Sequence, residues 1–248
     1  MIFGDFMDGV RVVFFDFYYT LFRPVYGEKE ALEKFFNGLV NFLHSEGFYN
    51  DKKFTRRSIE YEFNKSIGFF EMVREATLFD LPIDSLIKML ASRLFIFDVD
   101  VINRVVELYT NALINSVEPY PEAKEILSYL RNSGFKIGLI SNVQQYRFVD
   151  GALKKFGLDI FNLKVYSGIV GVRKPHRAIF EYAINKINVE REEALMVGDR
   201  FVEDFYGAIN AGLRAILLVR NKNMLNVYRK YLKDDVLISS LTGLKDLL

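Results

Sequence analysis

The sequence contains no cysteine and only two histidines, His44 and His176, which lie far apart. The absence of cysteine excludes disulfide bonds, thiol nucleophiles and cysteine metal sites, and it fits a protein of a reducing compartment. Two separated histidines do not indicate a histidine-rich metal site. The cytoplasm is therefore the expected location.

An excess of one charge, long apolar runs and proline-rich linkers are also missing. The formal net charge is only +1, so no global field would attract nucleic acid or an anionic membrane surface. No segment has the roughly 18 uninterrupted apolar residues of a membrane-spanning helix, and residues 1–9 do not resemble a signal peptide or an anchor. Five prolines and no low-complexity tract indicate a soluble protein without a long disordered linker. The sequence does not indicate an oligomeric state.

Short apolar runs alternate with helical patterns in much of the chain. Runs typical of strands buried on both faces occur at residues 10–15, 136–140, 194–197 and 215–219. Helical spacing of apolar residues occurs between them, at residues 122–133, 148–156 and 177–187. This alternation predicts an α/β fold with a doubly wound, Rossmann-like parallel sheet.

The segment 23–117 shows helical patterns without the alternating strands. The spacing predicts helices over residues 28–45, from Thr55 or Ser58 onward, over 85–95 behind Asp84 and over 101–113 behind Asp100, with these polar residues as N-caps. The segment 118–121, with two prolines, indicates the return to the sheet. We therefore expect a core of residues 1–22 and 118–248, with a small all-helical cap inserted at 23–117.

Three polar residues follow predicted strands directly: Asp16, Ser141 and Asp199. Ligands of open parallel sheets bind beyond the carboxyl ends of the strands. Residues that are far apart in the sequence are thus expected to meet at one edge of the sheet. Each of them alone has an ordinary structural explanation as a turn or capping residue.

The chemistry of these positions suggests an anionic substrate. A carboxylate such as Asp16 can act as a nucleophile and form a covalent intermediate that water later releases. Ser141 and Asn142 could bind an oxyanion through a hydroxyl and backbone N–H groups. Lys174 could neutralise the nucleophile and the substrate together, and Thr20 could orient the turn or bond the substrate, although an ST-turn explains it nearly as well.

A second pair of acids, Asp199 and Asp204, would face Asp16. Carboxylates that face one another raise each other's pKa values unless a cation lies between them. Magnesium prefers oxygen ligands of this kind. The sequence therefore predicts a Mg²⁺ site, while two acids on a solvated helix start are the alternative.

The ordered set of segments resembles the four motifs of the haloacid dehalogenase-like hydrolase superfamily. The resemblance covers about residues 10–220 and rests on residues 16–21, Ser141-Asn142, Lys174-Pro175, and Gly198-Asp199 with Asp204. It implies a Rossmann-like core with a helical cap inserted after the first strand.

The resemblance also implies roles for single residues. Asp16 would be the nucleophile, and Ser141 with Asn142 and Lys174 would bind the transferred group. Magnesium would be held by the Asp16 carboxylate, the Tyr18 backbone carbonyl and Asp199, with Asp204 supporting the metal or Lys174. The expected partner is a small phosphorylated substrate.

The sequence departs from the family pattern at Tyr18 and Tyr19. Phosphatases of the family usually have an aspartate at the first position, as general acid and base, and a glycine at the second. A tyrosine at the first position is similar to the 2-haloacid dehalogenase branch, whose leaving halide needs no proton. That branch is metal-independent, however, and has no counterpart of Asp199.

Three hypotheses follow. The first is a magnesium-dependent phosphatase that acts on a small phosphorylated metabolite through an aspartyl phosphate on Asp16. The second is a 2-haloacid dehalogenase. The third is a catalytically weak protein of this fold that binds a phosphorylated ligand or a partner, because Tyr18 and Tyr19 disable the proton transfer.

Overall fold

A parallel β-sheet forms the centre of the larger part of the molecule. The computed structural model of the chain describes residues 8–47 and 54–247. The strands are β1 (Val12–Phe15), β4 (Lys136–Ser141), β5 (Leu163–Tyr166), β6 (Ala194–Gly198), β7 (Arg214–Leu218) and β8 (Leu237–Ile238). They lie in the order β5-β4-β1-β6-β7-β8 and all pair in parallel. Counted along the chain, this is the 3-2-1-4-5-6 order of a Rossmann fold.

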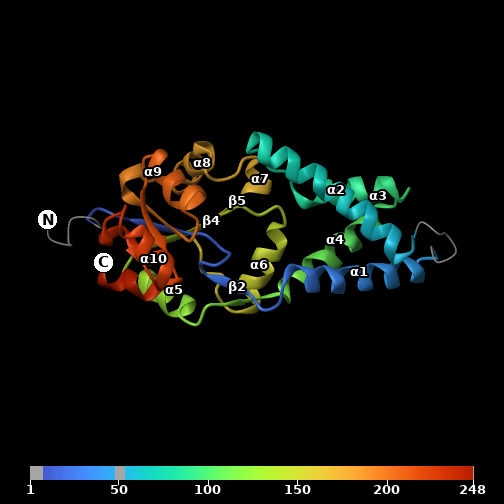
Figure 1. Cartoon of the computed structure of the whole chain (residues 1–248), viewed down its shortest axis with the longest axis horizontal. Coiled ribbons are helices and arrows are strands. Elements are labelled where there is room, and N and C mark those ends of the chain that lie inside the picture. Colours follow the sequence, from blue (N-terminus) through green and yellow to red (C-terminus); the bar gives the residue numbers. More distant parts are fainter. Residues whose placement is uncertain (1–7, 48–53, 248) are drawn as a thin grey trace.

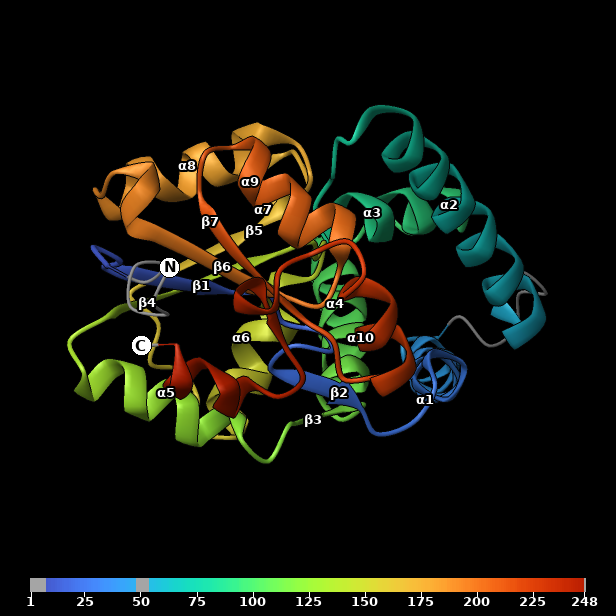
Figure 2. The same ribbon diagram turned by 60° about the vertical axis from the view of Figure 1, so that its left-hand side comes forward.

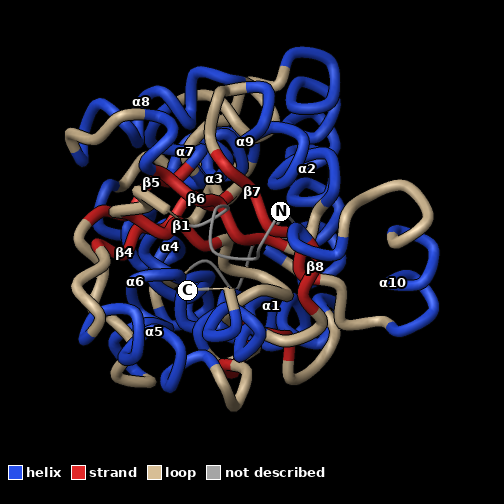
Figure 3. The backbone as a smooth tube through the Cα atoms, turned by 90° about the vertical axis from the view of Figure 1, so that its left-hand side faces the viewer, coloured by secondary structure: helices blue, strands red, loops and turns tan. Residues whose placement is uncertain are grey.

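Helices cover both faces of this sheet, which explains why its strands are apolar at nearly every position. In β1, Val13 and Phe15 pack in the core on one face, and Val12 and Phe14 pack in the core on the other. The first face is covered by α5 (Ala123–Asn132) and α6 (Tyr146–Lys155), and the second by α8 (Arg177–Ile187) and α9 (Gly207–Asn210). Figures 2 and 3 show the strands between these layers.

The shorter elements of this part lie between the strands or, after β8, at the end of the described chain. They are α7 (Ser167–Val170), α10 (Lys222–Tyr228), the 3₁₀ helices η3 (Arg191–Glu193), η5 (Asp234–Val236) and η6 (Leu241–Asp246), and the π-helical segment η4 (Phe201–Tyr206).

A group of helices lies at the other end of the molecule (Figure 1). It consists of α1 (Glu28–Ser45), α2 (Arg56–Thr77), α3 (Ile83–Arg93) and α4 (Val99–Ile114), which enclose a separate apolar core around Phe35, Phe63 and Ile87. The chain enters this group through β2 (Phe22–Pro24) and returns through β3 (Val117–Pro119), and the two strands pair antiparallel. The two connections to the sheet therefore run side by side.

The helix boundaries correct two expected N-caps. The helices 28–45 and 177–187 begin and end as the sequence predicts, and Thr55 caps α2. Asp84 and Asp100, in contrast, lie inside the first turns of α3 and α4. Asp98 is the N-cap of α4, because its carboxylate accepts hydrogen bonds from two backbone N–H groups of the first turn at 2.8 and 3.1 Å.

Besides the pair β2 and β3, the structure adds the strands β5 and β8 to those that the apolar runs predict. β5 contains Lys164 and is half-exposed over its first two residues, and β8 has only two residues, so neither forms a continuous apolar run. None of the described helices is long and apolar enough to cross a membrane. The expectation for residues 1–9 falls mostly on residues 1–7, which lie outside the described residues.

Candidate active site

Asp16 follows β1 at the point where the strand order of the sheet reverses. β1 lies between β4 and β6, and the Asp16 N–H donates to the Val197 carbonyl of β6 at 3.0 Å. Asp16 lines a cavity of about 490 Å³, and its side chain is 10% exposed. Where the strand order reverses, the chain segments that follow the neighbouring strands run to opposite faces of the sheet. They leave a crevice at the carboxyl ends of the strands, and ligands of such folds bind there.

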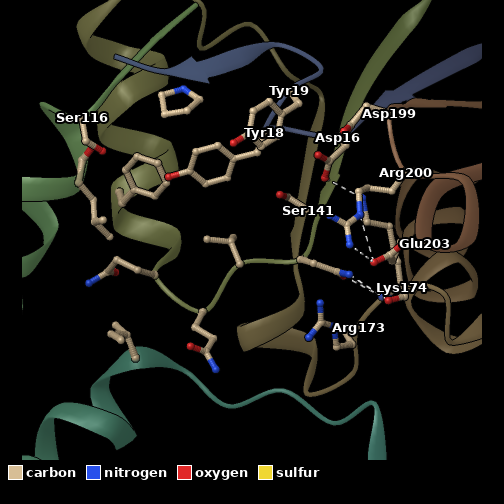
Figure 4. A pocket seen from close by; sticks show the side chains of 18 of the residues that line it. Asp16, Tyr18, Tyr19, Ser116, Ser141, Arg173, Lys174, Asp199, Arg200 and Glu203 are labelled. Carbon is tan, nitrogen blue, oxygen red and sulfur yellow. Dashed lines mark hydrogen bonds and ion pairs between the residues drawn. The ribbon is translucent and has the colours of Figure 1, made fainter. Parts of the chain in front are cut away.

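Lys174 is the fully buried centre of the polar cluster in this cavity (Figure 4). Its Nζ donates to Asp16 Oδ1 at 2.7 Å, to Asp204 Oδ1 at 2.6 Å and to the Ile140 carbonyl at 2.7 Å. Burial by itself would lower the pKa of Lys174, but the charges of Asp16 and Asp204 outweigh it and raise the pKa. Lys174 is therefore a fixed positive charge beside Asp16.

Asn142 holds the backbone of Lys174. Its Oδ1 accepts from the Lys174 N–H at 2.8 Å, and its Nδ2 donates to the Lys174 carbonyl at 2.9 Å. Both ends of the amide are therefore engaged by one residue. Asn142 lines the cavity, but its side chain positions the lysine, whereas the sequence suggested direct contact with the substrate.

The second pair of acids follows β6. Asp199 directly follows that strand, and Asp204 lies in η4, where its Oδ2 accepts from the Arg200 N–H at 2.9 Å. A Cβ on Gly198 would lie 2.3 Å from the Asp204 carboxyl carbon. Only a glycine at position 198 lets Asp204 approach the end of β6 this closely.

The three acids form a compact oxygen site. Ligand oxygens of Asp16, Asp199 and Asp204 lie within 4.8 Å of one another. Burial and the charges of the other two acids raise the pKa of Asp199 to about 7. Burial raises the pKa of Asp204 to about 6 even though Lys174 acts in the opposite direction.

Asp199 Oδ1 is buried, and within the described part of the chain it has no hydrogen-bond partner. When all three carboxylates are ionised, they and the Lys174 ammonium together have a net charge of −2. An unpaired buried oxygen and a double negative charge fit a divalent cation that prefers oxygen ligands, such as Mg²⁺.

Tyr18 and Tyr19 form the turn after Asp16. A short parallel bridge joins this turn to Phe22 through the Phe17 carbonyl and the Tyr19 N–H, and it does not use the Tyr18 carbonyl. The Tyr18 ring packs against Phe17 and Phe148 with centroid distances of 5.3 and 5.7 Å. Tyr19 has a φ of 57°, the left-handed region that glycine adopts easily, which accounts for the glycine of the family pattern at this position.

Not every candidate residue reaches the cavity. Ser141 ends β4 and lines the cavity with a nearly buried side chain. Thr20, in contrast, is fully buried and does not line it, and its hydroxyl has no hydrogen-bond partner among the described residues. The geometry therefore does not support the expected contact between Thr20 and the substrate.

The cavity also contains charged residues that the motifs do not indicate. Arg200 and Glu203 form an ion pair at 2.8 Å on its wall, and Arg173 lies beside them (Figure 4). Arg74 reaches the cavity from α2, as do Ala31, Ile83 and Tyr109 from the other three helices of the inserted group. In the sequence, Arg173 stands out only by its place beside Lys174. No local sequence pattern indicates that Arg74 lines the cavity.

Fold and site together define a class of α/β proteins with a cluster of carboxylates around a lysine at the carboxyl edge of a parallel sheet. The sequence model of the haloacid dehalogenase-like hydrolases matches residues 10–212. The chain belongs to this family of hydrolases, as its motifs suggested.

Relatives of known activity match part of the chain. A glyceraldehyde 3-phosphate phosphatase of Pyrococcus abyssi is 35% identical over 108 residues, which is 44% of this chain and 45% of the relative. The pyrimidine 5′-nucleotidase YjjG of Escherichia coli is 42% identical over 113 residues, 43% of this chain and 48% of the relative. A phosphoserine phosphatase of Thermus thermophilus is 36% identical over 105 residues, 41% of each chain. The chain thus spans less than half the length of these three relatives.

Solved structures match over nearly the whole chain. A 2-haloacid dehalogenase of Pseudomonas syringae aligns with a TM-score of 0.68 at 21% identity and covers 96% of this chain and 97% of its own. A phosphatase of the same family from Thermococcus onnurineus aligns with a TM-score of 0.59 at 23% identity, with the same coverage of 96% and 97%. At these identities the likeness establishes the fold alone.

Proposed function

We propose that the protein is a magnesium-dependent phosphatase that hydrolyses a small phosphorylated metabolite through an aspartyl phosphate on Asp16. The observation that carries the proposal is the charge of the site, in which three carboxylates surround one lysine and Asp199 has an unpaired buried oxygen. Magnesium would be held by Asp16, Asp199, Asp204 and the Tyr18 carbonyl and would offset the negative charge of the carboxylates and the phosphoryl oxygens. The phosphatase names of the partial relatives point in the same direction.

The residues of the chain then have distinct tasks. An Asp16 carboxylate oxygen attacks phosphorus and forms the acyl phosphate, while the bond to the ester oxygen breaks, and its electrons leave with that oxygen, which takes up a proton from solvent to become the alcohol. Lys174 orients Asp16 and places a positive charge beside it, and Ser141 offers a hydroxyl to the phosphoryl oxygens. Water then adds to phosphorus and loses a proton to solvent, the bond to Asp16 breaks, and inorganic phosphate leaves with the carboxylate restored.

Tyr18 limits which alcohols leave easily. A phenol packed against Phe17 and Phe148 replaces the carboxylic acid that would protonate the leaving oxygen. General acid catalysis is typically worth about 10²- to 10⁴-fold. Acyl and aryl phosphates, whose leaving groups need little protonation, should therefore react faster than alkyl phosphates.

The inserted helices serve as a cap in this proposal. Residues 23–117 contribute a side chain from each of α1 to α4 to the cavity wall, so the identity of the substrate depends on them as well as on the sheet. A site for small phosphorylated compounds implies neither a nucleic acid nor a membrane partner. The cytoplasmic location stays a prediction from the sequence.

The proposal is tested by phosphate release from a panel of phosphate esters, including acetyl phosphate and p-nitrophenyl phosphate. We expect release with Mg²⁺ and none with excess chelator, and we expect Asp16→Asn to reduce it to background. Glu46→Gln, a change at an exposed position at the end of α1, is the control and should leave the rate unchanged. No release from any ester would count against the proposal.

The two alternatives predict other outcomes in the same assay. A dehalogenase would release chloride from 2-chloropropionate regardless of chelator, and the position of Tyr18 is the observation that favours it. A protein that only binds would retain affinity for phosphorylated ligands, while Asp16→Asn would leave any measured rate unchanged. A collapse of the rate in Asp16→Asn would reject this third hypothesis.

A further inference from the structure

Arg173 is a cation without a direct partner on the wall of the cavity. Its guanidinium makes no hydrogen bond or ion pair within the described part of the chain, although the side chain is only partly exposed and lines the cavity. The nearby Arg200 is already paired with Glu203. Arginine presents up to five N–H donors in a fork that matches carboxylate and phosphate oxygens.

Arg74 contributes a second guanidinium to the same cavity. It lies in the last turn of α2, and its side chain is 17% exposed. It contacts Glu71, and its Nε lies 3.6 Å from Asp80 without forming a hydrogen bond. The Nε is buried beside Asp80, so Arg74 contributes its positive charge to the cavity wall rather than a free Nε donor.

Backbone hydrogen bonds fix the two arginines close together. The Leu78 N–H donates to the Arg74 carbonyl at 3.0 Å, and the Leu78 carbonyl accepts from the Arg173 N–H at 3.0 Å. One residue thus links the end of α2 to the segment before Lys174. Burial and then the charge of Arg74 lower the pKa of Arg173, as expected for two cations that lie close together.

Asp80 does not supply the missing partner of Arg173. This fully buried carboxylate accepts hydrogen bonds from Gln144 Nε2 at 2.9 Å, from Ser167 Oγ at 2.6 Å and from the Leu81 N–H at 3.1 Å. Its oxygens are therefore engaged by neutral donors on the core and on its own loop, and Arg74 lies 3.6 Å away as a charged neighbour. The carboxylate holds the α2–α3 loop in place and leaves the Arg173 donors available.

We propose that Arg173 and Arg74 form a subsite for a second anionic group of the substrate, so that the preferred substrates are short phosphomonoesters that also carry a carboxylate or a second phosphate. The proposal rests on the phosphatase function and adds the class of substrate. Arg173 and Lys174 are consecutive, so the two anionic groups would bind within one cavity a few bonds apart. An anion at this position would relieve the repulsion between the two guanidinium groups and accept hydrogen bonds from Arg173.

The test compares 3-phosphoglycerate with glycerol 3-phosphate, in which a hydroxymethyl group replaces the carboxylate. We expect kcat/KM to be about 10- to 100-fold higher for 3-phosphoglycerate, the range of one or two charge-assisted hydrogen bonds. Arg173→Gln should bring this ratio close to one, mainly by raising KM for 3-phosphoglycerate, and Arg173→Lys should give an intermediate ratio. Arg57→Gln, an exposed change on α2, is the matched control and should leave the ratio unchanged.

Propane-1,3-diol bisphosphate distinguishes the two sources of the anion. A preference for it over 3-phosphoglycerate, lost in Arg173→Gln, would identify the second group as a phosphate and would still support the subsite. A wild-type protein that does not distinguish 3-phosphoglycerate and the bisphosphate from glycerol 3-phosphate would overturn the proposal. An unchanged ratio in Arg173→Gln would also overturn it.

A binding measurement separates this inference from the phosphatase function. Calorimetric titration of Asp16→Asn with the same two monophosphates requires no turnover. Tighter binding of 3-phosphoglycerate, lost when Arg173→Gln is added, would support the subsite even if no ester were hydrolysed. Equal binding of both compounds would refute the subsite while leaving the phosphatase proposal intact.

Discussion

The buried Lys174 contributes both to the stability of the fold and to the proposed reaction at Asp16. Its ammonium is bound by two carboxylates and one carbonyl; Lys174 and Asp204 are buried, and Asp16 is only slightly exposed where it lines the cavity. A buried ion pair is not in itself strongly stabilising, but removing one partner leaves the other charge uncompensated. The same contacts hold the Asp16 carboxylate in place beside a positive charge.

Replacement of Lys174 should therefore destabilise the fold as well as abolish activity. We expect Lys174→Met to lower the free energy of unfolding by about 3–5 kcal/mol near neutral pH, because Asp16 and Asp204 lose their counter-charge. Urea denaturation measures this loss. Lys222→Met, at an exposed position of α10, should change stability by less than about 0.5 kcal/mol. Equal stabilities of the two variants would contradict this account of Lys174.

Tyr18 leads to a prediction about leaving groups. Tyr18→Asp should raise the rate for alkyl phosphates relative to p-nitrophenyl phosphate by up to about 100-fold, the lower end of the gain from general acid catalysis. The comparison within one variant cancels any loss of packing against Phe17 and Phe148. Tyr18→Phe keeps the ring and should leave the relative rates as in the wild type. Unchanged relative rates in Tyr18→Asp would show that proton transfer does not depend on this position.

At the scale of elements, burial decides which strands the sequence predicts. β1, β4, β6 and β7 are almost entirely buried, so the sequence has to be apolar at nearly every position and the runs are recognisable. β5 lies at the edge of the sheet with Leu163 and Lys164 partly exposed, and this mixture resembles a loop. Tertiary pairing, which local sequence does not record, makes it a strand.

The N-terminus of α4 provides a second test at this scale. Asp98→Ala should cost about 1 kcal/mol, because two N–H groups of the first turn lose their acceptor. Asp100→Ala removes only a favourable charge near the helix dipole and should cost a few tenths of a kcal/mol. Thermal or urea unfolding of the two variants distinguishes them. A larger loss for Asp100→Ala would restore the N-cap that the sequence suggested.

At the scale of the whole molecule, the sequence predicts which residues lie at the carboxyl edge of the sheet far better than which residues from the inserted helices line the cavity. Asp16, Ser141 and Asp199 are predictable because the end of each strand is visible as the end of an apolar run. Arg74 is not predictable, because its place in the cavity depends on how α2 packs and on the loop that Asp80 fastens to the core. The buried position of Thr20 also follows from a turn geometry that residue types alone do not specify.

The charge of the site connects the stability of the whole chain to pH and, under the proposed function, to magnesium. Burial and neighbouring acids raise the pKa of Asp199 from 3.8 to about 7, so the folded state binds this proton more tightly than the unfolded state. Its contribution to stability is therefore fully present below about pH 4 and is lost as the pH rises through about 7. Mg²⁺ favours the ionised carboxylate and should offset this loss.

Unfolding at pH 5 and pH 8, with chelator and with Mg²⁺, tests this linkage. We expect Mg²⁺ to stabilise the protein more at pH 8 than at pH 5, by an amount of the order of 1 kcal/mol or more for each pKa unit by which the metal shifts Asp199. Asp199→Asn cannot titrate at this position and should lose most of the magnesium response. An equal response to Mg²⁺ at both pH values would contradict the linkage.

The most direct test of the central claim is to trap the covalent intermediate on Asp16. Borohydride reduces an aspartyl phosphate to homoserine, which peptide mass spectrometry can assign to a single residue. With acetyl phosphate and Mg²⁺, the account predicts homoserine at position 16 in the wild type, and none with chelator or in Asp16→Asn. Turnover without any reduced residue, or with the reduced residue at Asp199 or Asp204, would contradict the assignment of Asp16 as the nucleophile.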